Sequence, residues 1–93
     1  MANLRFLKKE IDYRLEEFAF DCHMAIFVQP NKEEAIVELM SRGVELRNAL
    51  YHKANNPAEP KNRSLTKKHY AALRRDMDAS FETLFGDLAE ACK

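Results

Sequence analysis

The amino-acid sequence predicts an all-α fold, in which three long helices form a bundle that homodimerisation completes. Only two glycines and three prolines occur in 93 residues. The prolines, Pro30, Pro57 and Pro60, fall in two places, so three long segments contain no proline. In each segment apolar residues recur at spacings of three and four, the period of an amphipathic helix. The length fits one helical domain over residues 1–93.

The first helix is predicted over residues 3–28 and carries two apolar rows. One has the spacing of a core face: Leu4, Leu7, Ile11, Leu15, Phe18, Cys22, Ala25 and Ile26. The other, called the aromatic row below, places a ring at every seventh position and includes one methionine: Phe6, Tyr13, Phe20, Met24 and Phe27. At ~100° per residue, the aromatic row points about 140–200° away from the core row. The two rows therefore lie on opposite sides of the helix.

The second helix is predicted over residues 32–53, after the break at Gln29 and Pro30. Asn31 with Glu34 resembles a capping box at its start. Its apolar face comprises Ile36, Leu39, Met40, Val44, Leu46, Leu50 and Tyr51. Gly43 lies within that arc, where a missing side chain lets another helix approach closely, and a large ring is its natural complement.

A loop at residues 54–64 and a third helix over residues 65–92 complete the chain. Turn-forming residues fill the loop, and Ser64 or Thr66 can cap the helix that follows. The second helix begins acidic and ends basic, whereas the third begins basic and ends acidic. A parallel packing would therefore match their charges, either within the chain, where the long loop permits a crossover, or against the second helix of a partner.

Two arrangements would give the aromatic row a partner. In one, the first helix lies centrally and the other two helices cover its two faces. In the other, three helices share one core and the row remains exposed as a subunit interface. We favour a homodimer, because large aromatic side chains dominate interface energies and symmetric pairs are the commonest oligomers.

Composition excludes several classes of function. Fifteen acidic and fifteen basic residues give zero formal net charge, which removes the global attraction expected of a general nucleic-acid or membrane-surface binder. No apolar run approaches the ~20 residues of a membrane span, and the first residues lack the apolar centre of a signal peptide. We expect a cytoplasmic protein with two reduced cysteines, Cys22 and Cys92, and without a cofactor.

One short motif carries catalytic chemistry. The stretch "LRNALYHKA" holds Arg47, Asn48 and His52 and resembles the R-N-x-x-x-H signature of the HEPN ribonucleases, helical proteins that act as dimers. That resemblance implies that Arg47 and His52 act on a phosphodiester, with Asn48 beside them. A cation stabilises the phosphorane charge and an imidazole transfers the proton. The alternative is structural: the stem of Arg47 crosses the apolar face and its guanidinium reaches a carboxylate, while Asn48 and His52 face solvent.

A second group of residues could hold phosphates. Six basic residues occur without an acid between them, and they are called the basic patch below: Lys61, Arg63, Lys67, Lys68, Arg74 and Arg75. A solvated loop and helix start is the simpler interpretation. The stretch "DCH" at residues 21–23 is unsuited to a metal, because consecutive helical residues diverge by ~100°. We therefore expect no metal site.

Several stretches together resemble a group of small uncharacterised helical proteins of Bacteroidetes: "NLRFLKKEIDY", "DC", "ELRN", "NP", "HYAALRRDM" and "LF". The resemblance spans nearly the whole chain, implies an all-helical cytoplasmic protein and supplies no activity. The function we expect is therefore a non-enzymatic homodimeric interaction or regulatory module, with itself or an unidentified protein as partner. The alternative is a HEPN-like endoribonuclease, for which RNA would be the partner. Neither involves a membrane.

Overall fold

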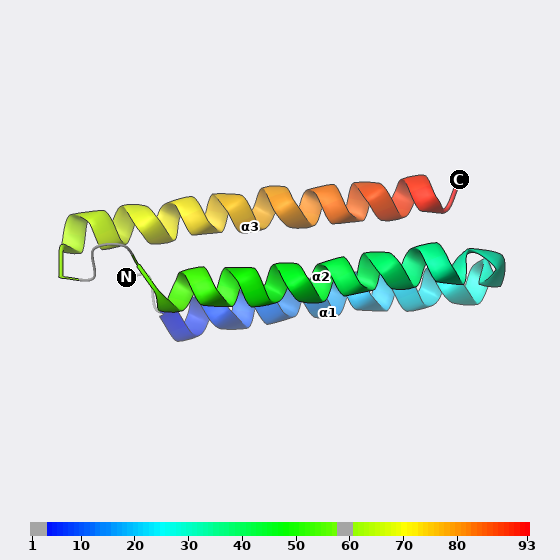
Figure 1. Cartoon of the computed structure of the whole chain (residues 1–93), viewed down its shortest axis with the longest axis horizontal. Coiled ribbons are helices and arrows are strands. Elements are labelled where there is room, and N and C mark those ends of the chain that lie inside the picture. Colours follow the sequence, from blue (N-terminus) through cyan, green and yellow to red (C-terminus); the bar gives the residue numbers. More distant parts are fainter. Residues whose placement is uncertain (1–3, 58–60) are drawn as a thin grey trace.

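The computed structural model describes residues 4–57 and 61–93 and consists of three long helices lying side by side (Figure 1). They are α1 (Leu4–Val28), α2 (Glu33–Asn55) and α3 (Arg63–Ala91), with a 3-10 turn, η1 (Pro30–Lys32), before α2. The described residues contain no strand, which confirms the all-α class. The molecule is a rod of 51 × 19 × 17 Å.

The start of α2 differs from the prediction. Asn31 lies inside η1, and Lys32 is the N-cap without a side-chain hydrogen bond, so the predicted capping box is wrong. The backbone N–H of Lys32 donates to the Gln29 carbonyl at 3.0 Å. Pro30 explains the difference, because its fixed φ and missing N–H suit the first position of a helical turn. The chain therefore begins to coil at Pro30.

The start of α3 also comes earlier than predicted. Asn62 is its N-cap, and the side-chain oxygen of Asn62 accepts a hydrogen bond from the Leu65 backbone N–H at 3.1 Å. Asparagine is among the best N-cap residues, so it starts the helix at Arg63, before the predicted caps Ser64 and Thr66. At the other side of the connection, α2 continues to Asn55. Residues 58–60 of the predicted loop lie outside the described residues.

The three helices run in alternating directions (Figure 1). The end of α1 meets the end of α3, where Gln29 Nε2 donates to the Cys92 carbonyl at 2.9 Å. The end of α2 meets the start of α3, where the His69 ring lies 2.8 Å from the Lys53 carbonyl. The parallel packing of α2 and α3 indicated by charge order is therefore absent within one chain, and a parallel packing against the α2 of a second copy stays a prediction. Exposed ion pairs contribute only a few tenths of a kcal/mol each, whereas burying one large apolar side chain contributes about 1.5–3 kcal/mol.

One core runs along the axis of the rod. It consists of Leu7, Ile11, Phe18, Cys22, Ile36, Leu39, Leu50, Ala54, Leu73, Met77, Phe81, Leu84 and Leu88. The rings of Phe18 and Phe85 meet edge to face, with centroids 5.2 Å apart. Gly43 is buried, and a Cβ there would lie 3.2 Å from side-chain atoms of both Leu15 and Phe18. The close approach predicted at Gly43, with a large ring opposite, is confirmed.

Candidate functional site

The aromatic row of α1 is exposed along its whole length. Exposed fractions are 58% for Phe6, 64% for Tyr13, 63% for Phe20, 48% for Met24 and 81% for Phe27. On the opposite side of the same helix, Leu7, Ile11, Phe18 and Cys22 are at most 1% exposed. The arrangement in which α2 and α3 cover both faces is therefore wrong. The helix has two apolar faces, and the single chain buries one.

Ion pairs to the neighbouring helices flank the aromatic row. On the α3 side, Arg74 Nη1 lies 2.9 Å from Glu10 Oε2, and Arg14 Nη2 lies 2.6 Å from Asp78 Oδ1. On the α2 side, Arg47 Nε lies 3.1 Å from Asp12 Oδ1. These pairs join α1 to both neighbours and leave the row between them facing outward.

The aromatic row continues onto a shallow groove at one end of the rod. Met24 lines this groove of about 410 Å³ together with Val28, Phe85, Leu88 and Cys92 from α1 and the end of α3. Val28 is 70% exposed. Sequence reasoning missed Val28, because it lies about 100° round the helix from Phe27. It also placed Val44 on the buried face of α2, whereas Val44 is exposed.

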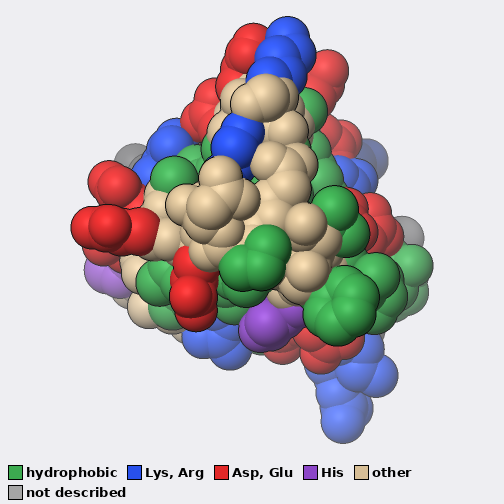
Figure 2. Space-filling view, turned by 90° about the vertical axis from the view of Figure 1, so that its right-hand side faces the viewer, with side chains coloured by type: hydrophobic (Ala, Val, Ile, Leu, Met, Phe, Trp, Pro, Cys, Tyr) green, Lys and Arg blue, Asp and Glu red, His purple; other side chains and the backbone are tan. Residues whose placement is uncertain are grey.

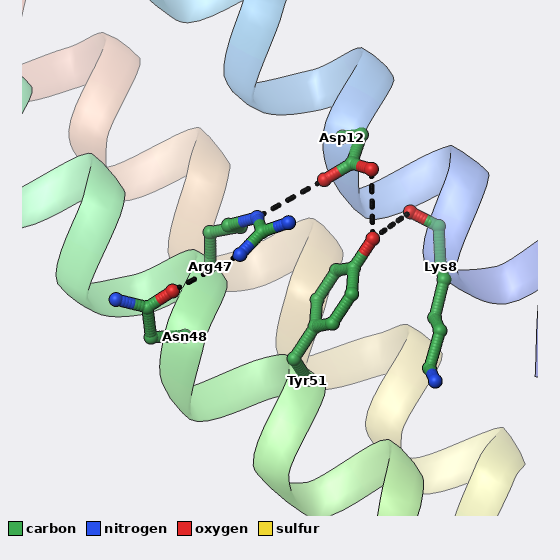
Figure 3. A network of polar contacts seen from close by, with 5 residues as sticks. All are labelled: Lys8, Asp12, Arg47, Asn48 and Tyr51. Atoms are coloured by element: carbon green, nitrogen blue, oxygen red, sulfur yellow. Dashed lines mark hydrogen bonds and ion pairs between the residues drawn. The ribbon is translucent and has the colours of Figure 1, made fainter.

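Arg47 belongs to a network that joins α2 to α1 (Figure 3). Its guanidinium lies 4.1 Å from the centre of the Tyr51 ring, while the Tyr51 hydroxyl donates to Asp12 Oδ2 at 2.7 Å. Asp12 thus accepts from both side chains, Nε of Arg47 on one oxygen and the phenol on the other. The hydrogen bond to Asp12 raises the pKa of Arg47 above its ordinary value. The geometry matches the structural alternative for Arg47, with its guanidinium on a carboxylate at the edge of the helix.

The other two residues of the predicted catalytic motif lie differently. Arg47 Nη1 donates to Asn48 Oδ1 at 3.2 Å, so these two are together (Figure 3). His52 is exposed on α2, and its neighbour is Asn56, whose side-chain amide donates to the His52 carbonyl at 2.8 Å. Within the described chain, no hydrogen bond or ring contact joins His52 to Arg47. One chain therefore brings together two of the three motif residues.

The basic patch divides into two parts. Arg74 is half-buried and paired with Glu10, so it serves the α1–α3 contact. The other members are exposed, and most lie around the start of α3: Lys61, Arg63, Lys67, Lys68 and Arg75. Beside them, His69 and Tyr70 are directed toward the last carbonyls of α2, at Lys53 and Ala54. These contacts fix the start of α3 against α2.

The two cysteines are free and are placed differently. Cys22 is buried in the core, and burial raises its pKa to about 11, with smaller contributions from Asp21 and Cys92. Cys92 is half-buried at the end of α3. Among residues 4–57 and 61–93, no group of three or more His, Cys, Asp or Glu side chains is placed to hold a metal ion.

No family model, curated protein or solved structure matches the chain. None of the described helices combines the length and the apolar character needed to cross a membrane.

Proposed function

We propose that this chain is a non-enzymatic interaction module that pairs with a second copy through the aromatic row of α1. The exposure of Phe6, Tyr13, Phe20, Met24 and Phe27 on one helix face carries the proposal. Side chains of this kind supply most of the energy at protein interfaces, and a helix that needs only one core face has no structural use for a second. We also propose a cytoplasmic location, which the two free cysteines fit.

The area of the aromatic row is sufficient for a pair. A large side chain presents roughly 200 Å², so five that are about 60% exposed leave on the order of 600 Å² in water. That is the upper range of the largest apolar patch on an ordinary monomer. Two copies would remove about 1,200 Å², which lies at the lower limit of specific interfaces. A homodimer of modest affinity is therefore the expected assembly.

The spacing of the aromatic row suits a helical partner. Residues seven apart drift only about 20° per repeat on a straight helix, and a gentle left-handed supercoil removes that drift. The four rings span 22 residues of α1, which is about 30 Å of helix. A second α1 offers the same length and the same spacing, and a self-complementary patch is what a two-fold pair requires.

Sedimentation velocity tests the pairing. The wild type at tens of micromolar should sediment as a dimer, whereas a double variant, Tyr13→Gln with Phe20→Gln, should sediment as a monomer of unchanged helix content. Val44→Gln is the matched control, because Val44 is an exposed apolar residue of α2 outside the aromatic row. That control should remain dimeric. A monomeric wild type, or a double variant that still pairs, would overturn the proposal.

The ribonuclease alternative would use Arg47, Asn48 and His52. The hydrogen bond between Arg47 and Asn48 favours it, whereas the engagement of Arg47 with Asp12 and Tyr51 favours a packing role. The assay incubates the purified protein with total RNA beside folded His52→Ala and Arg47→Ala variants. RNA cleavage that both variants lose would support the alternative, because removing a general acid or base costs about 10²- to 10⁴-fold. Cleavage that survives in His52→Ala would exclude it.

A further inference from the structure

Charge is separated along the length of the rod. One half comprises residues 4–16, 45–57 and 61–80 and contains twelve Lys and Arg against six Asp and Glu. The other half comprises residues 17–44 and 81–93 and contains three Lys and Arg against eight Asp and Glu. A chain without formal net charge is therefore strongly polar from end to end.

The alternating helix directions produce this separation. The acidic start of α2 lies beside the acidic end of α3, and the basic start of α3 lies beside the end of α2 (Figure 1). Figure 2 looks onto this end, where acidic side chains lie at the top and on both sides with some basic side chains among them, and hydrophobic side chains gather in the lower part of the view. The aromatic row runs along α1 from the basic half into the acidic half.

We infer that the second copy lies antiparallel on α1, so that the basic end of each copy lies beside the acidic end of the other. This inference rests on the proposed homodimer and specifies its geometry. A two-fold axis would pass between the two α1 helices, level with Glu16 and Glu17 and midway along the aromatic row. Phe6 would then lie opposite Phe27 of the partner subunit, and Tyr13 opposite Phe20 of the partner subunit.

The aromatic row alone does not decide the direction. Its equal spacing overlaps fully with a second row in either a parallel or an antiparallel pair. Charge distinguishes the parallel from the antiparallel pair. In a parallel pair, the two basic halves, each with an excess of six positive charges, would lie side by side, and so would the two acidic halves, each with an excess of five negative charges. An antiparallel pair places each excess beside its opposite. Complementary fields of this kind fix orientation more than they add affinity.

The antiparallel register also gives Arg14 carboxylate neighbours beside the aromatic row. In the antiparallel register, the rise of ~1.5 Å per residue places Arg14 between Glu17 and Asp21 of the partner subunit, about 3 Å from each along the axis. Arg14 is 38% exposed while paired with Asp78, so it remains accessible to these carboxylates.

Cross-linking in mixed dimers reports whether the two α1 helices are parallel or antiparallel. Lys9 and His23 are exposed, lie on the same flank of the aromatic row and are equidistant from the inferred axis to within one residue. Two variants, Lys9→Cys and His23→Cys, are each made in a chain that also carries Cys92→Ser. One of them is affinity-tagged, and the two are mixed. Cys22 needs no replacement, because it is buried with a raised pKa. A short bis-maleimide then joins thiols that lie close together.

The antiparallel pair predicts a cross-linked product in the mixture and little with either variant alone. The reason is that each introduced cysteine lies about 20 Å along the axis from its own copy, but beside the other variant. Self-cross-linking of each variant alone, without a mixed product, would overturn the inference and leave the homodimer standing. A monomer in sedimentation would overturn both.

Salt provides a second readout. Because opposite charges would face each other, the dimer dissociation constant measured by sedimentation equilibrium should rise as NaCl increases from 50 to 500 mM and screens them. A constant that falls as salt increases would indicate like charges side by side and would contradict the antiparallel pair.

Discussion

Gly43 allows a sharp test of the packing between α2 and α1. Gly43 is buried, and a Cβ at this position would lie 3.2 Å from Leu15 Cδ1 and 3.2 and 3.3 Å from two ring atoms of Phe18. Gly43→Leu would add three further carbons beyond that Cβ. Both neighbours belong to the face of α1 that packs against the other helices, so there is no solvent into which the new side chain can turn without moving α1.

Two opposing terms set the magnitude. Leucine is a better helix former than glycine by about 0.8 kcal/mol, which favours the variant. Overpacking of a filled core costs typically about 1–3 kcal/mol, and three inserted carbons place this site at the upper limit or beyond. We expect a net loss of about 1–3 kcal/mol. For a domain of this size, such a loss lowers the melting temperature by about 4–8 °C per kcal/mol.

Thermal melts followed by circular dichroism measure the effect, at one fixed protein concentration because pairing would make the melting temperature depend on concentration. Gly86→Leu is the matched control: Gly86 is exposed on α3, and nothing lies within 4 Å of a Cβ there. That variant gains helix propensity without a clash and should melt above the wild type. If Gly43→Leu melts at or above the wild-type temperature, the close approach of α2 to Leu15 and Phe18 is refuted.

Two further predictions concern the side chains with raised pKa values. Burial, and secondly the hydrogen bond to Asp12, raise the pKa of Tyr51. Its contribution to stability is therefore complete below pH ~10 and is lost as pH rises through the folded-state pKa. In urea unfolding between pH 8 and 11, the free energy of unfolding of Tyr51→Phe should fall less steeply with pH than that of the wild type. Burial likewise raises the pKa of Cys22 to about 11. A thiol reagent at pH 8 should therefore modify Cys92 well before Cys22, as followed by peptide mass spectrometry. Equal rates of modification would contradict the burial of Cys22.

The fold class was predictable from apolar spacing and from the placement of the prolines, whereas the helix starts and topology were not. Pro30 starts its turn before the predicted cap at Asn31, and Asn62 replaces the predicted caps of α3. In each case several residues that can begin a helix lie close together, and their spacing does not indicate which of them is the N-cap. Surface charge order did not indicate the direction of α3 relative to α2 within the chain, because burial of the shared apolar faces dominates.

The candidate site divides in a similar way. Because successive residues of a helix are 100° apart, the sequence of the first helix alone shows that the aromatic row lies opposite the core row. The Arg47 network required the fold, because Asp12 is 35 residues away in the chain and reaches Arg47 and Tyr51 only when α1 and α2 pack. The sequence predicted that Arg47 would reach a carboxylate, but it could not identify which carboxylate.

The helix directions also explain why a charge order that looks unfavourable can persist. Within one chain, antiparallel packing places Glu33 and Glu34 of α2 at the same end as Asp87 and Glu90 of α3. Two contacts offset part of this crowding, because Arg42 Nη2 lies 2.9 Å from Asp87 Oδ2 and Lys93 Nζ lies 3.0 Å from Glu90 Oε1. Among residues 4–57 and 61–93, no ion pair involves Glu33 or Glu34. An antiparallel second copy on the aromatic row would bring an excess of positive charge beside this end, so the same charges that oppose folding of the single chain would favour the pair. Selection for pairing would then retain them, and replacing Glu33 and Glu34 by glutamine should raise the dimer dissociation constant measured by sedimentation equilibrium.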